Sequence, residues 1–136
     1  MSKGLEPSPT PDTLPYWQAA KEGRLSIQAC NACKRYYFYP RSGCPNCGSV
    51  DVEWRDVSGR GRLVSYVINY LPIPPAEPKV PQVNALIELE EGVRMVSNII
   101  GTPAEPDALP LGAAVVVAFE ERGEWILPVF KLAGAA

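Results

Sequence analysis

Cys30-Asn31-Ala32-Cys33 and Cys44-Pro45-Asn46-Cys47 contain all four cysteines of this 136-residue chain, and ten residues separate the two Cys-x-x-Cys pairs. Two intervening residues allow both thiolates of one pair to reach a single tetrahedral ion, and a second pair on a return turn completes the shell. The spacing therefore predicts a zinc ribbon with Cys30, Cys33, Cys44 and Cys47 as ligands. Because protein thiolates fill all four positions, we expect a structural zinc rather than a catalytic one.

Other uses of the cysteines are less consistent with the sequence. Residues 1–15 contain no apolar signal-peptide core, so we expect a cytoplasmic, reducing location in which disulfides are rare. A thioredoxin-type redox pair requires one Cys-x-x-Cys near a βαβ pattern, which the sequence lacks. Rubredoxin-like iron stays open as an alternative metal, because the same sulfur cage accepts it.

The composition argues against catalysis by this chain on its own. It contains no histidine, which removes the commonest general base and every His-dependent nucleophile. The cysteines are assigned to metal, and no phosphate-loop or dinucleotide-binding glycine motif is present. Most carboxylates, such as those of residues 88–91, lie in turn-like or alternating surface settings. We therefore predict no catalytic residues.

The charge and the apolar runs of the chain argue against two classes of partner. Thirteen basic and fifteen acidic side chains give a net charge of −2, and residues 57–136 hold the acidic excess. A protein that neutralises several phosphates should be basic, so the charge disfavours a nucleic-acid partner. No apolar run approaches the ~20 residues that span a bilayer, so we expect no membrane partner.

The chain divides into three predicted segments: a flexible Pro-rich arm at 1–12, a helix plus zinc ribbon at 13–56, and a β domain at 57–136. Thr13 can cap a short helix that Gly23 ends. Strands at 25–29 and 52–56 should enter and leave the ribbon. The arm carries prolines at alternate positions, which favours an extended conformation.

Six aromatic residues of the first half are candidates for a partner interface. A run of four lies between the cysteine pairs, and a strand of period two cannot bury all of them. Packing between ribbon and β domain is one explanation, a partner interface is another, and stacking on bases beside Arg35 and Arg41 is a third. The six candidates are Tyr16, Trp17, Tyr36, Tyr37, Phe38 and Tyr39.

The second half has the pattern of a small barrel. Expected strands lie at 61–70, 83–90, 93–100, 114–121 and 125–131, with a tight hairpin at Glu90-Glu91-Gly92. Five short antiparallel strands match the strand count of an OB-fold. Prolines within 101–112 disfavour a helix there. The segment 71–81 holds five prolines and is either a stiff surface loop or a preformed binding arm. The predicted fold class is mainly β, with a short N-terminal helix, a rubredoxin-like ribbon and a five-stranded OB-fold barrel.

From residue 16 to residue 130 the chain resembles a family of acyl-CoA-associated proteins with a rubredoxin-like zinc ribbon and an OB-fold, long catalogued as a domain of unknown function. The resemblance is carried by the four cysteines and by residues 16–25 (YWQAAKEGRL), 57–61 (VSGRG), 109–112 (LPLG) and 127–130 (LPVF). It implies that the metal site maps onto the four cysteines. It also implies a non-catalytic accessory subunit that clamps a thiolase-superfamily catalytic subunit and helps shape its acyl-CoA site.

If this chain contacts a CoA phosphate, the candidates are Arg60, Arg62 and Lys79, because these cations flank the first barrel strand and the loop after it. Two alternative functions stay open at this point. One is a single-stranded nucleic-acid-binding module, since ribbon and OB modules both occur in such proteins. The other is a small electron carrier with iron in the four-cysteine cage.

Overall fold

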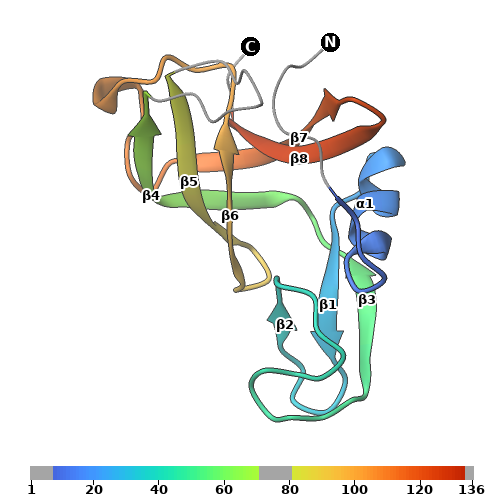
Figure 1. The fold of residues 1–136 in the computed structure, drawn as a ribbon. Coiled ribbons are helices and arrows are strands. Elements are labelled where there is room, and N and C mark those ends of the chain that lie inside the picture. Colours follow the sequence, from blue (N-terminus) through green and yellow to red (C-terminus); the bar gives the residue numbers. More distant parts are fainter. Residues whose placement is uncertain (1–7, 71–80, 134–136) are drawn as a thin grey trace.

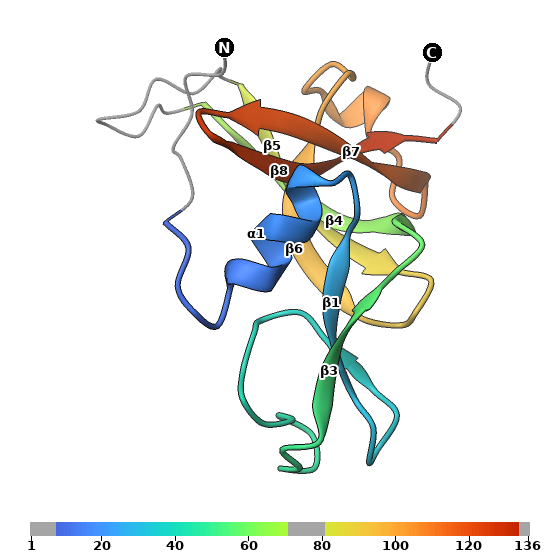
Figure 2. The same ribbon diagram turned by 90° about the vertical axis from the view of Figure 1, so that its right-hand side faces the viewer.

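The computed structural model describes residues 8–70 and 81–133, which form a barrel, a small three-stranded ribbon and one helix that packs against both (Figure 1). Helix α1 spans Leu14–Lys21 and contacts strand β1 of the ribbon and strand β8 of the barrel. Figure 2 shows α1 beside β8, with the ribbon extending away below the barrel. The predicted mainly-β fold class is confirmed.

The sequence around α1 defines both of its ends. Thr13 occupies the N-cap, but its hydroxyl does not cap the helix and instead accepts a hydrogen bond of 2.8 Å from the Thr10 amide. The expected side-chain cap is therefore wrong. At the other end Gly23 adopts a φ of 76°, and its amide donates to Ala20 O at 3.0 Å. The Arg24 amide donates to Ala19 O at 2.9 Å, which completes a Schellman-type stop.

The ribbon is an antiparallel sheet of β1 (Ser26–Cys30), β2 (Tyr36–Tyr37) and β3 (Val52–Asp56) in the order β2-β1-β3. Every residue of the central strand β1 is buried. Gln28 tolerates burial because its amide donates to Arg41 O at 2.9 Å and accepts from Arg41 N at 2.7 Å. The strands expected to enter and leave the ribbon are confirmed.

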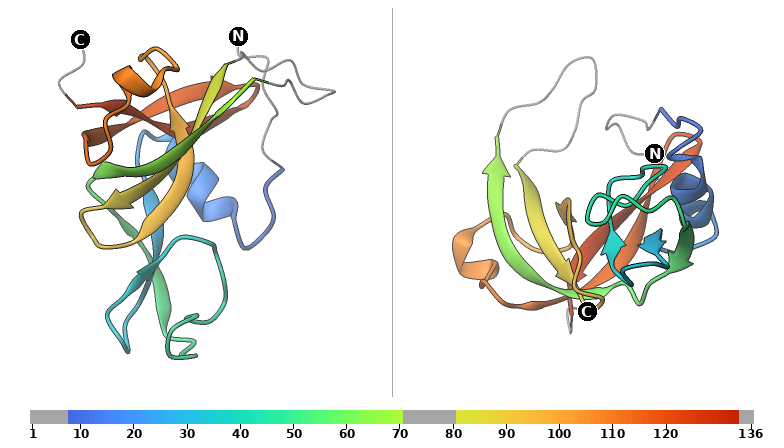
Figure 3. Two further views of the ribbon diagram at one scale, coloured as in Figure 1. Left: turned by 90° about the vertical axis from the view of Figure 1, so that its left-hand side faces the viewer. Right: turned by 90° about the horizontal axis from the view of Figure 1, so that it is seen from below.

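The barrel closes in the order β4-β5-β6-β8-β7, with β7 pairing back to β4. All five expected strands are present, each within two residues of its predicted ends. Their bounds are β4 Arg60–Asn69, β5 Gln82–Leu89, β6 Arg94–Ile99, β7 Ala114–Arg122 and β8 Trp125–Leu132. Figure 3 shows β4, β5 and β6 curving together around the barrel.

One strand pairing corrects the expectation of an antiparallel barrel. β6 and β8 run parallel and share the single register pair Ile99–Phe130 in the part of the chain that the structure describes. The segment before β7 carries only the short 3-10 turn Pro106–Ala108, in agreement with the expected absence of a helix. Most of the proline-rich segment, at 71–80, lies outside the described residues.

Two glycines allow the start of β4 to lie close to the adjacent strands β5 and β7. A Cβ on Gly59 would lie 2.3 Å from Val117 Cγ1, and one on Gly61 would lie 2.4 Å from the backbone oxygen of Glu88. Gly59 also has a φ of 76°, which favours glycine. The Gly59-Arg60-Gly61 sequence therefore leads into β4 and serves close packing.

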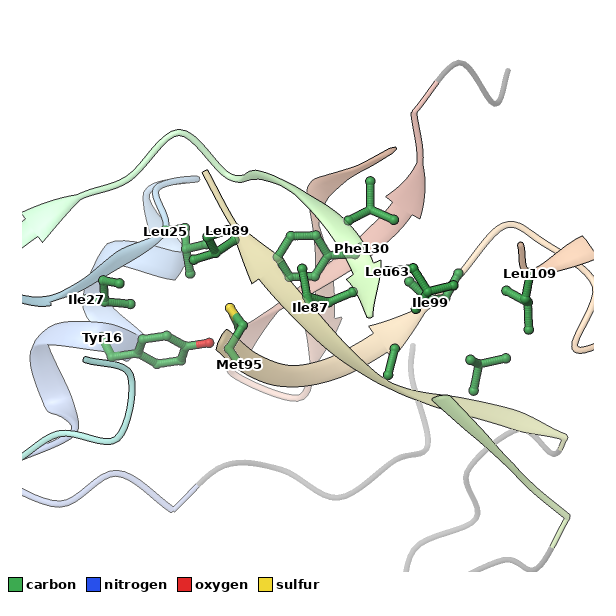
Figure 4. Packing of buried hydrophobic residues seen from close by; sticks show 13 residues of the cluster. Tyr16, Leu25, Ile27, Leu63, Ile87, Leu89, Met95, Ile99, Leu109 and Phe130 are labelled. Carbon is green, nitrogen blue, oxygen red and sulfur yellow. The ribbon is translucent and has the colours of Figure 1, made fainter. Parts of the chain in front are cut away.

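The larger of two apolar clusters among the described residues connects the helix, the ribbon and the barrel. Tyr16 and Ile27 join the barrel residues Leu89, Met95 and Phe130 in one cluster (Figure 4). In the close-up, the Tyr16 ring points toward Met95. Near the predicted boundary between residues 56 and 57, the chain passes from the sheet of the ribbon to that of the barrel. The apolar core is continuous across this boundary. Within 8–70 and 81–133, no helix is both long enough and apolar enough to cross a membrane.

Candidate metal centre and aromatic pocket

The four cysteine thiols meet at one end of the ribbon. All four Sγ atoms lie within 4.8 Å of one another. The Cys30 and Cys47 sulfurs are 3.5 Å apart, and those of Cys33 and Cys44 are 3.6 Å apart. Thiolates bound tetrahedrally to zinc at about 2.3 Å are separated by about 3.8 Å. The cluster therefore fits one metal ion, and its four thiols are the residues that would hold it.

Two similar turns present these thiols. The Lys34 amide donates to Cys30 O at 3.0 Å, and the Gly48 amide donates to Cys44 O at 2.9 Å. Lys34 and Gly48 adopt positive φ values of 65° and 78°. The positive φ at position 48 agrees with the presence of glycine there, whereas no feature of the sequence indicates that Lys34 takes the same conformation.

Backbone amides in the turns favour the thiolate form of two cysteines. The Cys33 amide lies 3.4 Å from Cys30 Sγ and lowers the pKa of that thiol, which burial opposes. Burial raises the pKa of Cys44, but hydrogen bonds from the amides of Cys47 and Asn46 and from the thiols of Cys33 and Cys47 outweigh it and bring the value to about 6. The Ser49 amide lowers the pKa of Cys47, but hydrogen bonds with the neighbouring thiols and burial outweigh it and raise the value to about 11. Cys30 and Cys44 are therefore the two thiols that favour the deprotonated form a metal ligand needs.

The six aromatic candidates separate into two groups in the structure. Tyr37 is only 6% exposed, and its hydroxyl donates to Arg41 O at 3.0 Å inside the ribbon. Tyr36 packs against the main core. By contrast, Phe38 meets the Tyr16 ring edge-on with centroids 5.7 Å apart, and Tyr39 is 63% exposed beside it. Burial raises the pKa of Tyr16 far above its usual value, so its ring acts as an uncharged surface.

Tyr16, Trp17 and Phe38 form one wall of an open, mainly apolar cavity of about 260 Å³, which we call the aromatic pocket. The barrel supplies the opposite wall, which the sequence did not identify. Among the residues of this wall, only Pro128 has a recognisable feature in the sequence. A proline inside an expected strand lacks the amide hydrogen for one backbone hydrogen bond of the sheet. The remaining lining residues are Thr13, Pro40, Val96, Ser97, Asn98, Leu127 and Pro128.

The candidate CoA contacts lie elsewhere on the barrel and have carboxylate partners. Arg60 Nε donates to Glu90 at 2.9 Å, and Arg62 Nε donates to Glu88 at 2.9 Å. The hydrogen bond from Arg62 lowers the pKa of Glu88. An incoming phosphate would compete with these carboxylates for both guanidinium groups. Lys79, the third candidate, lies outside the described residues.

Comparison with known families matches both halves of this architecture. Residues 17–53 match the model described as "ChsH2, rubredoxin-like zinc ribbon domain", and residues 54–120 match "ChsH2, C-terminal OB-fold domain". The chain belongs to the ChsH2/DUF35 family. The resemblance inferred from the sequence is thereby confirmed, as is the assignment of the four-cysteine cluster to a zinc-ribbon domain.

Members of the ChsH2/DUF35 family include scaffold proteins and parts of larger enzymes. A "DUF35 domain-containing scaffold protein" of Methanothermobacter thermautotrophicus is 34% identical over 74% of this chain and 77% of its own length. A "Probable enoyl-CoA hydratase alpha subunit" of Thermomonospora curvata is 40% identical over 95% of this chain. This chain spans only 40% of that hydratase subunit.

A solved family member matches from end to end. The structure described as "Ltp2-ChsH2(DUF35) aldolase" contains a chain that is 40% identical to this one, with a TM-score of 0.81. The match covers 94% of this chain and 99% of that chain. The order of helix, ribbon and barrel is thus common to both proteins.

Proposed function

We propose that this chain is a non-catalytic scaffold subunit that binds a thiolase-like catalytic subunit acting on acyl-CoA thioesters. The observation that carries the proposal is the end-to-end match, at 40% identity, with the DUF35 chain of an aldolase that is named for both Ltp2 and ChsH2. A match over 99% of that chain means that this protein has the corresponding ribbon, helix and barrel in full.

The chemistry of the side chains supports a scaffold role. Thiolase chemistry uses a reactive cysteine and a histidine base. This chain has no histidine, and its four cysteines converge on one cluster. We assign a structural zinc to that cluster, since four protein thiolates leave no coordination position for substrate. The reacting groups must then come from the catalytic partner.

We assign partner contact to the aromatic pocket and its rim. Trp17 and Phe38 are partly exposed there, and Tyr39 extends the apolar surface outward. Aromatic side chains are enriched at interfaces, because they bury a large area at little cost in entropy. Tyr16 and Tyr36 belong to the core beside this surface, and Tyr37 packs with Cys30 and Cys44 inside the ribbon, so we assign all three to its support.

We further propose that the barrel contributes to the acyl-CoA site of the complex. Arg60 and Arg62 project from the start of β4 beside a shallow depression with a volume of about 770 Å³. Their side chains are more than half exposed, so a phosphate group can reach them. Lys79 remains the third candidate.

The test is affinity purification of the tagged chain from its native host, followed by mass spectrometry. We expect a thiolase-like chain at near-stoichiometric amount. Co-purification of nucleic acid, with binding that falls steeply between low and moderate salt, would replace this proposal with the single-strand-binding alternative. A tagged chain that elutes alone would contradict it.

A further inference from the structure

Strand β6 has an open edge where the barrel closes. β5 pairs with β6 along its whole length, from Glu88–Arg94 to Val83–Ile99. On the opposite side β8 meets β6 at the one pair Ile99–Phe130, within the part of the chain that the structure describes. Ahead of that pair the two strands diverge, and the aromatic pocket opens between them.

The backbone groups along this edge follow from the hairpin register. The Leu89 amide donates to Val93 O at 2.8 Å, so alternate residues of β6 after Val93 face β5. The residues between them, Arg94 and Val96, turn their amides and carbonyls away from β5, and Val96 lines the aromatic pocket. Ile100 belongs to the same outward series and confirms the alternation, because its amide donates to Phe130 O at 2.9 Å.

Strand β8 does not provide backbone hydrogen bonds to this part of β6. Pro128 has no amide hydrogen, and its carbonyl already accepts a hydrogen bond of 3.0 Å from Ser97 Oγ. Val96 is 54% exposed, so this residue of the edge can be reached from outside. An open edge with aligned donors and acceptors is a template for pairing with another chain.

The size of the aromatic pocket favours a peptide over a cofactor. Small-molecule sites usually measure about 300–1,000 Å³ and enclose most of their ligand. This cavity is open and measures about 260 Å³, which suits one or two side chains of an extended segment. Its apolar wall of Tyr16, Trp17, Phe38 and Leu127 favours apolar side chains.

A row of charged side chains on the outer face of the barrel indicates the charge of one residue in the extended segment that would bind here. Arg62 on β4, Glu88 on β5 and Arg94 on β6 lie side by side, so the sign alternates from strand to strand. Arg62 Nη2 approaches Glu88 to 2.5 Å, whereas Arg94 Nε stays at 3.5 Å. The row carries two guanidinium groups and one carboxylate. An acidic residue in the same row of an added strand would complement Arg94.

We propose that the catalytic partner subunit adds an extended strand to the open edge of β6. The strand places an acidic side chain opposite Arg94 and an apolar side chain in the aromatic pocket. Its backbone pairs with the outward amide and carbonyl of Val96, in the manner of β-strand addition to a sheet edge. This inference rests on the proposed function and deepens it by naming the chemistry of the contact.

The first test uses the unmodified protein. Hydrogen exchange is measured by NMR on the labelled chain, alone and in complex with the thiolase-like protein that co-purifies with it. The Val96 amide should exchange at least tenfold more slowly in the complex, while the Met95 amide, which faces β5, should be protected in both states. Equal exchange at Val96 in the two states would overturn the proposal.

The second test compares two charge reversals. Arg94→Glu and Lys131→Glu each reverse the charge of one exposed basic side chain on the barrel. Only Arg94 lies on the edge strand, so Arg94→Glu should weaken the affinity for the partner tenfold or more, against less than threefold for Lys131→Glu. If both variants bind the co-purifying partner with equal affinity, strand addition is refuted and the proposed function stands. If no thiolase-like chain co-purifies, strand addition and the proposed function both fail.

Discussion

The ring of Tyr16 on α1 meets the ring of Phe38 in the ribbon edge-on, at 5.7 Å between centroids. Tyr16 also belongs to the core cluster of the barrel. One side chain therefore connects the three parts of the molecule and forms a wall of the aromatic pocket. The contact is one of those that hold the ribbon against the barrel.

Replacing Tyr16 with alanine should lower the free energy of unfolding by about 3 kcal/mol, the usual cost of removing a buried aromatic ring. Chemical denaturation followed by tryptophan fluorescence measures the change. Tyr39→Ala is the matched control, because that ring is exposed and its loss should cost less than about 0.5 kcal/mol. Equal losses in both variants would show that Tyr16 is not the connecting residue.

Removing the metal should unfold the ribbon while part of the barrel persists. Cys44→Ser deletes a buried ligand, whereas Asn46→Ala changes an exposed position of the same turn and should keep the metal. We expect one zinc per chain in the native protein and in Asn46→Ala, and none in Cys44→Ser, by elemental analysis. Far-ultraviolet circular dichroism should show reduced but remaining β structure in Cys44→Ser. A red protein that contains iron would contradict the assignment of zinc.

Gly59→Ala should be strongly destabilising, because the added methyl group would lie 2.3 Å from Val117 Cγ1 in a backbone with a φ of 76°. We expect a loss of roughly 2–4 kcal/mol. Gly101→Ala tests the conformational part alone, since Gly101 has a φ of 71° but open space around it, and should cost about 1 kcal/mol. Thermal unfolding of the two variants checks the difference. A loss in Gly59→Ala no greater than that in Gly101→Ala would argue against the tight start of β4.

The ion pair of Arg62 and Glu88 should make a pH-dependent contribution to stability. The hydrogen bond from Arg62 lowers the pKa of Glu88 in the folded state below its ordinary value of 4.5. The stabilisation by this ion pair is therefore present above pH 4.5, and it is lost as the pH falls through the pKa of Glu88 in the folded state. Arg62→Ala should be less stable than the native protein at pH 7, and the difference should shrink below pH 4.5. Because the Arg62 side chain is exposed to solvent, 1 M salt should reduce this difference in stability as well. A difference independent of pH would contradict this account.

The sequence predicted the local parts of this structure and missed those that depend on distant register. Alternation and turn residues located all five barrel strands, and the spacing of the cysteines located their cluster. The parallel pairing of Ile99 with Phe130 has no local signature, because it joins segments on either side of an intervening hairpin strand. The contacts of Arg62 depend on an irregularity in β4 between Leu63 and Ser65, which no periodicity reveals.

The aromatic candidates show the same limit. Four consecutive rings indicated that some must stay exposed, and the structure identifies Tyr39 as the exposed one and Tyr37 as the buried one. The barrel side of the pocket, including Val96 and Leu127, could not be predicted. It forms only when folding brings β6 and β8 together with α1 around one cavity.

The measurement that tests the central claim most directly is native mass spectrometry of the assembly purified through this chain from its host. The account predicts a complex of fixed ratio with a thiolase-like subunit, whose acyl-CoA activity is lost when that subunit's reactive cysteine is replaced. It also predicts that Cys44→Ser in this chain abolishes assembly. A chain that is recovered alone, or with bound nucleic acid in place of a protein partner, would contradict the account.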